Sequence, residues 1–276
     1  MKIQTIQLDG VEVHTRTYGD PSRRPVLCLH SLFLNGAMFH DWAEYVSEEL
    51  FVVAPDLRGQ GRSPDTENQA ILDMDLYAQD IHNFLSVLSE QYGITTVGIL
   101  AQSMGGDVGL RVAYNCPGKV NSIALLGSSA CNEPVDQLED FVKWVRGVEE
   151  FGFRGETLDY TLKVMLGETC RGDSERQHVV DDMRDQLRAL DKDLLPAMRG
   201  VVQRESILEK LPFISIPALI FSGQEDWVRP SAWSRLMSDL LPRARLVELN
   251  NVGHSPILEA PNRVFSQLKN FFLTAP

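Results

Sequence analysis

Ser103 lies in a segment that could present a serine hydroxyl to a substrate. The segment Ala101-Gln102-Ser103-Met104-Gly105-Gly106 directly follows an apolar run and directly precedes a stretch of helical character. A sharp turn from strand to helix holds the hydroxyl clear of the backbone and places the next N–H at a helix N-terminus. The turn requires small residues two positions before and after the serine, and Ala101 and Gly105 are small. The segment therefore predicts that Ser103 is a nucleophile for acyl transfer.

A serine at the start of a helix is in most proteins only a cap, so the segment alone is a weak signal. A catalytic serine also needs a base and an orienting acid, and these come from other parts of the chain because a triad meets in space and not in sequence. His254 lies in a loop after the last expected strand, within Asn251-Val252-Gly253-His254-Ser255-Pro256. Glu225 and Asp226 lie in the loop after the preceding strand, and either carboxylate could orient the imidazole. The order along the chain would be serine, acid, histidine, and the three side chains would meet in space.

The elements that must position these residues alternate along most of the chain. Apolar or alternating runs typical of strands occupy residues 11–17, 25–30, 51–54, 95–100, 120–126, 216–221 and 245–249. Apolar residues recur at helical spacing over about 75–91, after Ser103, over 231–240 and in the closing segment. This alternation predicts an α/β fold with a mostly parallel, twisted sheet flanked by helices.

Residues 130–211 interrupt the alternation. They contain no convincing strand and many charged residues, and their apolar residues follow a helical pattern that includes Leu187, Leu190, Leu194 and Leu195. We therefore expect a helical cap at 130–211, inserted after the sixth strand, and one core domain formed by 1–129 and 212–276. A cap in this position would cover Ser103, exclude water and shape a pocket.

Five segments, in this order, resemble motifs of the α/β-hydrolase family: His30-Ser31-Leu32, Asp56-Leu57-Arg58-Gly59-Gln60-Gly61-Arg62-Ser63, Gln102-Ser103-Met104-Gly105-Gly106, Gly223-Gln224-Glu225-Asp226 and Val252-Gly253-His254. The resemblance covers nearly the whole chain. It implies the α/β-hydrolase fold and a catalytic triad of Ser103, His254 and Asp226, with Asp226 favoured over Glu225 as the acid. Two departures stand out, because the family often has glycine at the positions of Ala101 and Ser31.

The same resemblance assigns an oxyanion hole to the backbone N–H groups of Leu32 and Met104. Each such donor would lower the barrier by about 3 kcal/mol. His30 would shape the oxyanion loop, and Asp56 and Arg58 would fix a neighbouring loop through hydrogen bonds. The Ser-Leu pair at 31–32 is similar to the loop of 3-oxoadipate enol-lactonases, which implies a small carboxylic ester or a lactone as the substrate.

Bulk composition narrows the choice of partners. A formal net charge of −12 is the opposite of the basic footprint that nucleic acids require, and it disfavours anionic membranes. Residues 1–5 lack the apolar stretch of a signal peptide, and no run reaches the length of a membrane-spanning helix. The four cysteines form no C-x-x-C pair and no metal-ligand spacing, and no nucleotide-binding motif follows a strand. We expect a cytoplasmic protein with no metal and no cofactor; the sequence does not indicate its oligomeric state.

The triad leaves the reaction open among ester, lactone, amide and C–C bond hydrolysis. Other hypotheses are a lyase on the same triad and a hydrolase-fold signal receptor with slow turnover. We expect a substrate pocket formed by cap and core side chains, namely Phe33, Trp227, Phe141, Trp144 and Met165. The alternative is that the cap residues pack only the small core of the cap itself.

Overall fold

A single sheet organises the molecule. The computed structural model of the protein describes residues 1–8 and 11–276. Within them, eight strands are hydrogen-bonded in the order β1-β2-β4-β3-β5-β6-β7-β8. They are β1 (Lys2–Leu8), β2 (Val11–Tyr18), β3 (Arg24–Leu29), β4 (Leu50–Pro55), β5 (Val97–Gln102), β6 (Val120–Leu126), β7 (Ala218–Gly223) and β8 (Ala244–Leu249). The β1–β2 and β2–β4 pairs are antiparallel and all other pairs are parallel, so the predicted mostly parallel sheet is confirmed.

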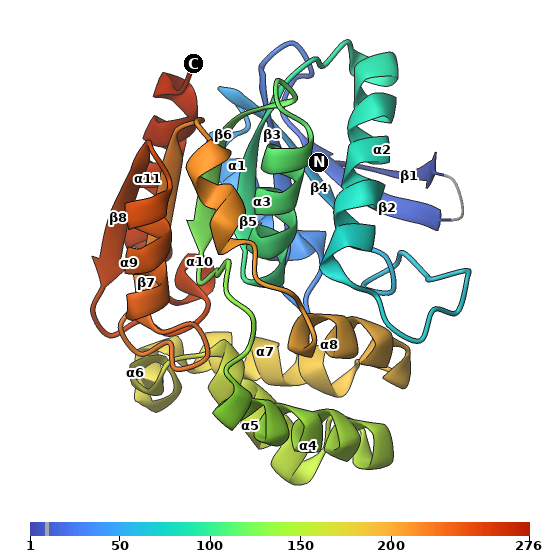
Figure 1. Cartoon of the computed structure of the whole chain (residues 1–276), viewed down its shortest axis with the longest axis vertical. Coiled ribbons are helices and arrows are strands. Elements are labelled where there is room, and N and C mark those ends of the chain that lie inside the picture. Colours follow the sequence, from blue (N-terminus) through green and yellow to red (C-terminus); the bar gives the residue numbers. More distant parts are fainter. Residues whose placement is uncertain (9–10) are drawn as a thin grey trace.

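Helices cover both faces of this sheet (Figure 1). One buried apolar cluster joins the sheet to α2 (Met74–Tyr92), α3 (Met104–Asn115) and α9 (Ser231–Leu240). A second cluster joins the other face to α1 (His40–Val46) and α11 (Pro261–Thr274). Neighbouring strand residues such as Leu27 and Cys28 belong to different clusters, because successive side chains of a strand point to opposite faces. The parallel strands read as continuous apolar runs for this reason.

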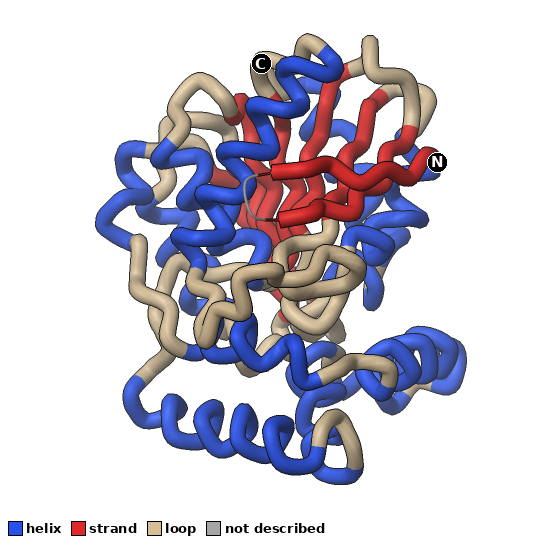
Figure 2. The backbone as a smooth tube through the Cα atoms, turned by 90° about the vertical axis from the view of Figure 1, so that its right-hand side faces the viewer, coloured by secondary structure: helices blue, strands red, loops and turns tan. Residues whose placement is uncertain are grey.

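The helical insertion follows β6 and ends before β7. Its elements are α4 (Val135–Phe151), α5 (Gly155–Met165), α6 (Glu168–Gly172), η2 (Ser174–Arg176), α7 (Gln177–Arg188), η3 (Lys192–Leu194), α8 (Leu195–Val202) and η4 (Leu208–Phe213). Helices α4 to α8 lie together at one end of the sheet, beyond the carboxyl ends of the parallel strands (Figures 1 and 2). Loops that carry chemistry in open parallel sheets leave from these carboxyl ends.

Local signals explain where the elements start and stop. Asp73 caps α2, because its carboxylate accepts a hydrogen bond from the N–H of Leu76 at 2.8 Å. The helix ends at Gly93, which has a left-handed φ of 70°. The sequence did not indicate β1 or the short α1; β1 is an edge strand with mostly exposed side chains, so it lacks an apolar pattern. In the described residues, no helix is both long and apolar enough to cross a bilayer.

Candidate active site

Ser103 occupies the turn between β5 and α3. Its backbone has φ 52° and ψ −117°, a strained conformation for a residue with a side chain, and its N–H donates to the carbonyl of Leu126 at 2.9 Å. A Cβ atom added at Gly105 would lie 2.1 Å from the carbonyl oxygen of Leu29, so only glycine fits there. The turn thus holds the hydroxyl clear of the backbone at the carboxyl edge of the sheet, and the backbone around it is tightly packed.

A chain of contacts joins the three residues expected to form a triad. Nε2 of His254 lies 2.7 Å from Oγ of Ser103, and Nδ1 lies 2.8 Å from Oδ2 of Asp226. His254 lies between β8 and α10 (Pro256–Glu259), and Asp226 follows β7. All three side chains are buried. The arrangement allows His254 to accept the Ser103 proton while Asp226 holds the opposite side of the imidazole.

Glu225, the other candidate acid, lies in a different contact. Its carboxylate accepts hydrogen bonds from the N–H of Thr169, at 2.8 Å, and from the hydroxyl of the same residue. Thr169 belongs to α6 of the insertion, so Glu225 connects the acid loop to that helix. Asp226 is the carboxylate that faces His254.

The loop after β3 brings Leu32 beside Ser103. Leu32 and Ser103 border one cavity, and Met104 begins α3, where N–H groups have no acceptor within the helix. His30 braces this loop, because its Nε2 accepts from the N–H of Leu57 and its Nδ1 donates to the carbonyl of Ser31, each at 2.8 Å. Burial lowers the pKa of His30, which keeps the ring neutral for this pair of bonds.

The loop between β4 and α2 is fixed by two further polar residues. Asp56 accepts from the N–H groups of Gly36 and Arg62 at 2.8 and 2.9 Å. Arg58 forms a two-pronged bond with Asp80 at 2.7 and 2.8 Å. These bonds hold Asp56 and Arg58 to groups other than Ser103, and both residues act on the shape of the loop.

Glu259, which the sequence did not single out, holds the loop that carries His254. Its Oε2 accepts from the N–H groups of Gly167 and Gly253, and its Oε1 from that of Ser255, each at 2.9 Å. Burial raises the pKa of Glu259, and these donors partly offset the effect. The two residues that flank His254 are thereby attached to one carboxylate. A carboxylate five positions after the base was the available signal in the sequence.

Four core residues attach the acid and base loops to the stretch of insertion from Lys163 to Thr169. Ser255 Oγ donates to the carbonyl of Met165 at 2.7 Å, and the indole of Trp227 donates to the carbonyl of Lys163 at 2.9 Å. Glu225 and Glu259 complete the set through the bonds described above. The insertion is therefore in direct contact with the loops that carry Asp226 and His254.

A buried network of charged side chains lies beside Ser103, and the sequence did not predict it. Nε of Arg204 lies 3.2 Å from Oδ2 of Asp107, and Nη1 of Arg204 contacts Oε1 of Glu133. Nη1 of Arg229 lies 3.0 Å from the same Oε1. Asp107 also pairs with Arg111 one helical turn along α3, and this spacing was the only signal available.

A small cavity of about 40 Å³ adjoins Ser103 and His254. Of the residues expected in a pocket, Phe33, Phe141, Trp144 and Met165 border it, together with Ser31, Leu32, Ser103, Glu133, Val164, Val201, Val202, Val228, Arg229 and His254. Trp227 lies outside this set. Its ring stacks on Phe141, with centroids 6.4 Å apart, and 43% of the residue is exposed.

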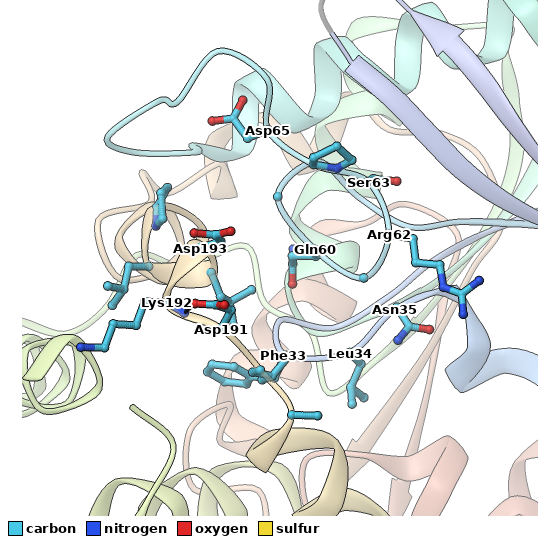
Figure 3. Close-up of a pocket in the computed structure, with 18 of the residues that line it drawn as sticks. Phe33, Leu34, Asn35, Gln60, Arg62, Ser63, Asp65, Asp191, Lys192 and Asp193 are labelled. Carbon is cyan, nitrogen blue, oxygen red and sulfur yellow. Dashed lines mark hydrogen bonds between the residues drawn. The ribbon is translucent and has the colours of Figure 1, made fainter. Parts of the chain in front are cut away.

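Phe33 also borders a groove of about 900 Å³ between the loop 59–69 and the insertion residues 186–199. Figure 3 shows this groove, with Gln60 and Asp65 on one side and Asp191 to Asp193 on the other. The Phe33 ring packs against Trp144 and Phe153 at centroid distances of 5.4 and 5.5 Å, and its backbone has a φ of 73°. Phe33 thus forms a wall shared by the groove and the small cavity.

The described residues contain no group of three or more histidine, cysteine or acidic side chains arranged to hold a metal ion.

A family model for the alpha/beta hydrolase fold matches residues 24–163, more than half of the chain. The chain belongs to this family. The predicted family and fold class are confirmed, and the prediction of a hydrolase enzyme is supported. A pimeloyl-[acyl-carrier protein] methyl ester esterase of Nitrosomonas europaea is 24% identical over 266 residues, which cover 92% of this chain and 97% of the relative.

Solved structures give the same fold. An enol-lactonase from Burkholderia xenovorans LB400 superimposes with a TM-score of 0.86 at 21% identity, covering 98% of this chain and all of the other. A thermophilic esterase from Thermogutta terrifontis has a TM-score of 0.85 at 23% identity, with 99% and 97% coverage. The helical insertion is included in both alignments, because they span nearly the whole chain.

Proposed function

We propose that this protein is a serine hydrolase that cleaves a small carboxylic ester or a lactone through an acyl-enzyme. Ser103 is the nucleophile, His254 the general base and acid, and Asp226 the residue that orients His254. The observation that carries the proposal is the continuous contact from Asp226 through His254 to Ser103, at 2.8 and 2.7 Å. Leu32 and Met104 contribute the two N–H groups of the oxyanion hole.

Acylation begins when Oγ of Ser103 attacks the carbonyl carbon of the substrate. His254 Nε2 takes the hydroxyl proton, and the carbonyl oxygen becomes an oxyanion that accepts hydrogen bonds from Leu32 and Met104. Asp226 stabilises the imidazolium that forms. The bond to the leaving oxygen then breaks, and His254 returns its proton to that oxygen, which leaves as an alcohol. In a lactone, the alcohol stays attached to the acyl group.

Deacylation repeats these steps with water. His254 removes a proton from the water as it attacks the acyl-enzyme, and the second oxyanion uses the same two N–H groups. When the bond to Oγ breaks, His254 returns the proton to Ser103, so the product is a carboxylic acid and the enzyme is regenerated.

Residues 130–211 serve as the cap in this proposal, with residues 1–129 and 212–276 as the catalytic core. Side chains of the insertion, among them Phe141, Trp144 and Met165, border the cavity at Ser103. The apolar side chains and limited volume of this cavity favour a small acyl or alcohol group. The esterase and enol-lactonase that share the fold are consistent with this substrate class.

Active-site labelling tests the proposal directly. A fluorophosphonate probe forms a bond to an activated serine, so the wild-type protein should be labelled stoichiometrically and Ser103→Ala should not be labelled. A panel of p-nitrophenyl esters and aliphatic lactones should show turnover that the same substitution abolishes. Activity of Ser103→Ala within tenfold of the wild type, with an unchanged melting curve, contradicts the assignment.

A further inference from the structure

Glu133 uses only one of its carboxylate oxygens in the charged network. Oε1 contacts both Arg204 and Arg229. Burial alone would raise the pKa of Glu133, but the two guanidinium groups together hold it below the usual value, so the side chain is ionised at neutral pH. The arginines fix the orientation of the carboxylate and direct Oε1 toward themselves.

Oε2 of Glu133 has no hydrogen-bond donor among the described residues. The residue is only 6% exposed, so bulk solvent does not compensate for the missing donor. A buried carboxylate oxygen without a donor is costly, and such groups in native proteins call for an explanation. Glu133 borders the same cavity as Ser103 and His254, where a substrate would be held.

We propose that Oε2 of Glu133 accepts a hydrogen bond from a hydroxyl group of the substrate, and that the preferred substrates are small hydroxy-substituted esters or lactones. This inference rests on the proposed function, because it places the hydroxyl on a molecule whose carbonyl is attacked by Ser103. Glu133 is in this role a specificity-determining residue that the triad does not require.

The charges around the cavity favour a neutral donor over an ion. A cationic group would meet the guanidinium group of Arg229, which borders the cavity beside Glu133. An anionic group would meet the Glu133 carboxylate itself. The other cavity walls are largely aliphatic, with Val164, Val201 and Val228 among them. A short aliphatic body that carries one hydroxyl matches this surface.

Arg204 also has an unpartnered atom in the network, and it offers a matched control. Its Nη2 lacks a hydrogen-bond partner among the described residues. Arg204 borders a separate crevice beside Ser103 that has no room for a water molecule, and it is not part of the wall of the 40 Å³ cavity. Replacing Arg204 therefore perturbs the network while the carboxylate of Glu133 itself is unchanged.

Volume-matched substrates test the inference in the wild-type protein. The first pair differs on the acyl side: methyl 3-hydroxybutyrate carries a hydroxyl where methyl 3-methylbutyrate carries a methyl. The second pair differs on the alcohol side: 2-hydroxyethyl butyrate carries a hydroxyl where propyl butyrate carries a methyl. We expect the hydroxylated member of one pair to have a kcat/KM at least about tenfold higher, because the unpaired carboxylate discriminates against a methyl group. Which pair responds tells on which side of the scissile bond the hydroxyl lies.

Glu133→Gln provides a sharper measurement. Both arginines require an acceptor at the Oε1 position, so the amide oxygen takes that position and the amide NH₂ occupies the Oε2 position. The cavity wall then donates instead of accepting. The preference for a hydroxyl over a ketone is the ratio of kcat/KM for the methyl ester of 3-hydroxybutyrate to that for the methyl ester of 3-oxobutyrate, or the same ratio for the alcohol-side equivalents. This ratio should fall at least tenfold relative to the wild type. Intrinsic substrate reactivity cancels in this comparison.

Arg204→Gln should keep the wild-type preference for the hydroxyl, even if its stability falls. A loss of preference in Arg204→Gln equal to that in Glu133→Gln would assign the effect to the network as a whole and overturn the inference. A ratio below threefold in both wild-type pairs would overturn it even if Glu133→Gln does not fold. If the ratios are below threefold but a fluorophosphonate labels Ser103 and esters are hydrolysed, only the inference about Glu133 is overturned and the proposed function stands. If there is neither labelling nor hydrolysis, the proposed function itself is overturned.

Discussion

The main-chain N–H of Arg229 donates to Oδ1 of Asp226 at 2.9 Å, which leaves Oδ2 to face Nδ1 of His254 at 2.8 Å. Each carboxylate oxygen therefore has a separate partner, and the backbone donor fixes which oxygen meets the imidazole.

Asp226→Asn should lower kcat by about 10⁴-fold with little change in substrate binding. The N–H of Arg229 requires an oxygen at the Oδ1 position, so the amide NH₂ would face Nδ1 of His254. The imidazole would then carry its proton on Nε2 and could not accept the proton of Ser103. Steady-state kinetics measure the loss. Glu225→Gln is the matched control, and a larger loss in that variant would mean that Glu225 is the acid.

His254→Ala should lose about as much activity as Ser103→Ala, on the order of 10⁶-fold, because the members of a triad act as a unit. The double variant Ser103→Ala/His254→Ala should therefore lose little more than either single variant. Turnover of one good ester by all three proteins measures this. Losses that multiply in the double variant would show that the two residues act independently.

Glu259→Gln should lower kcat by about 10²-fold and leave KM nearly unchanged. Oε2 of Glu259 accepts two N–H groups, so the amide oxygen would take that position and its NH₂ would oppose the N–H of Ser255. The displaced loop would move His254 away from Ser103, and small displacements of catalytic groups have costs of this size. Glu248→Gln, on the edge strand β8, is the control. Loss of stability with an unchanged kcat would mean that Glu259 has no effect on the base.

The stability contributed by the Glu133 charge should depend on pH. The pKa of Glu133 in the folded protein is below its usual value of 4.5, so this contribution is fully present above pH 4.5 and is lost as the pH falls through the folded-state pKa. At neutral pH, Glu133→Gln should cost about 3 kcal/mol, or a Tm decrease of about 6–12 °C. The difference in Tm from the wild type should shrink below pH 4.5. A difference independent of pH would show that packing, not charge, causes the loss.

Phe33→Ala should widen the range of accepted esters. The Phe33 ring is a wall of both the small cavity at Ser103 and the large groove, so its removal joins the two spaces. The ratio of kcat/KM for p-nitrophenyl octanoate to that for p-nitrophenyl acetate should rise by about tenfold or more. Phe153→Ala removes a neighbouring ring that borders neither space and serves as the control. An equal change in both variants would place the barrier elsewhere.

The sequence predicted most of the sheet because buried parallel strands are apolar on both faces. Strands β5 and β6 and helix α9 lie within two residues of their predicted bounds. Strand β1 was missed because an exposed edge does not require apolar residues. The segment 130–211 was recognised as helical mainly through the absence of strand patterns. The bounds of its individual helices were not predicted, because they depend on packing between residues that are distant in the sequence.

The position of Ser103 in a turn between a strand and a helix was predictable, because the local sequence determines that turn. Glu133, Arg204 and Glu259 were missed because their roles come from partners 71, 71 and 92 residues away in the chain. Trp227 was also expected in the pocket, and it is not among the residues that border the small cavity. Its indole donates to the carbonyl of Lys163, and its ring stacks on Phe141.

The hydrogen bonds between the insertion and the loops that carry Asp226 and His254 have a consequence for how the substrate choice of such enzymes can change in evolution. On the insertion side, the bonds use mainly backbone groups, namely the carbonyls of Lys163 and Met165 and the N–H groups of Gly167 and Thr169. Backbone groups are retained when side chains change. Gly167 is the exception, since a Cβ there would lie 2.5 Å from Glu225 and 2.7 Å from the nitrogen of Gly253. Mutations in α4 to α8 can therefore alter substrate choice over many generations while the alignment of His254 and Asp226 is inherited intact.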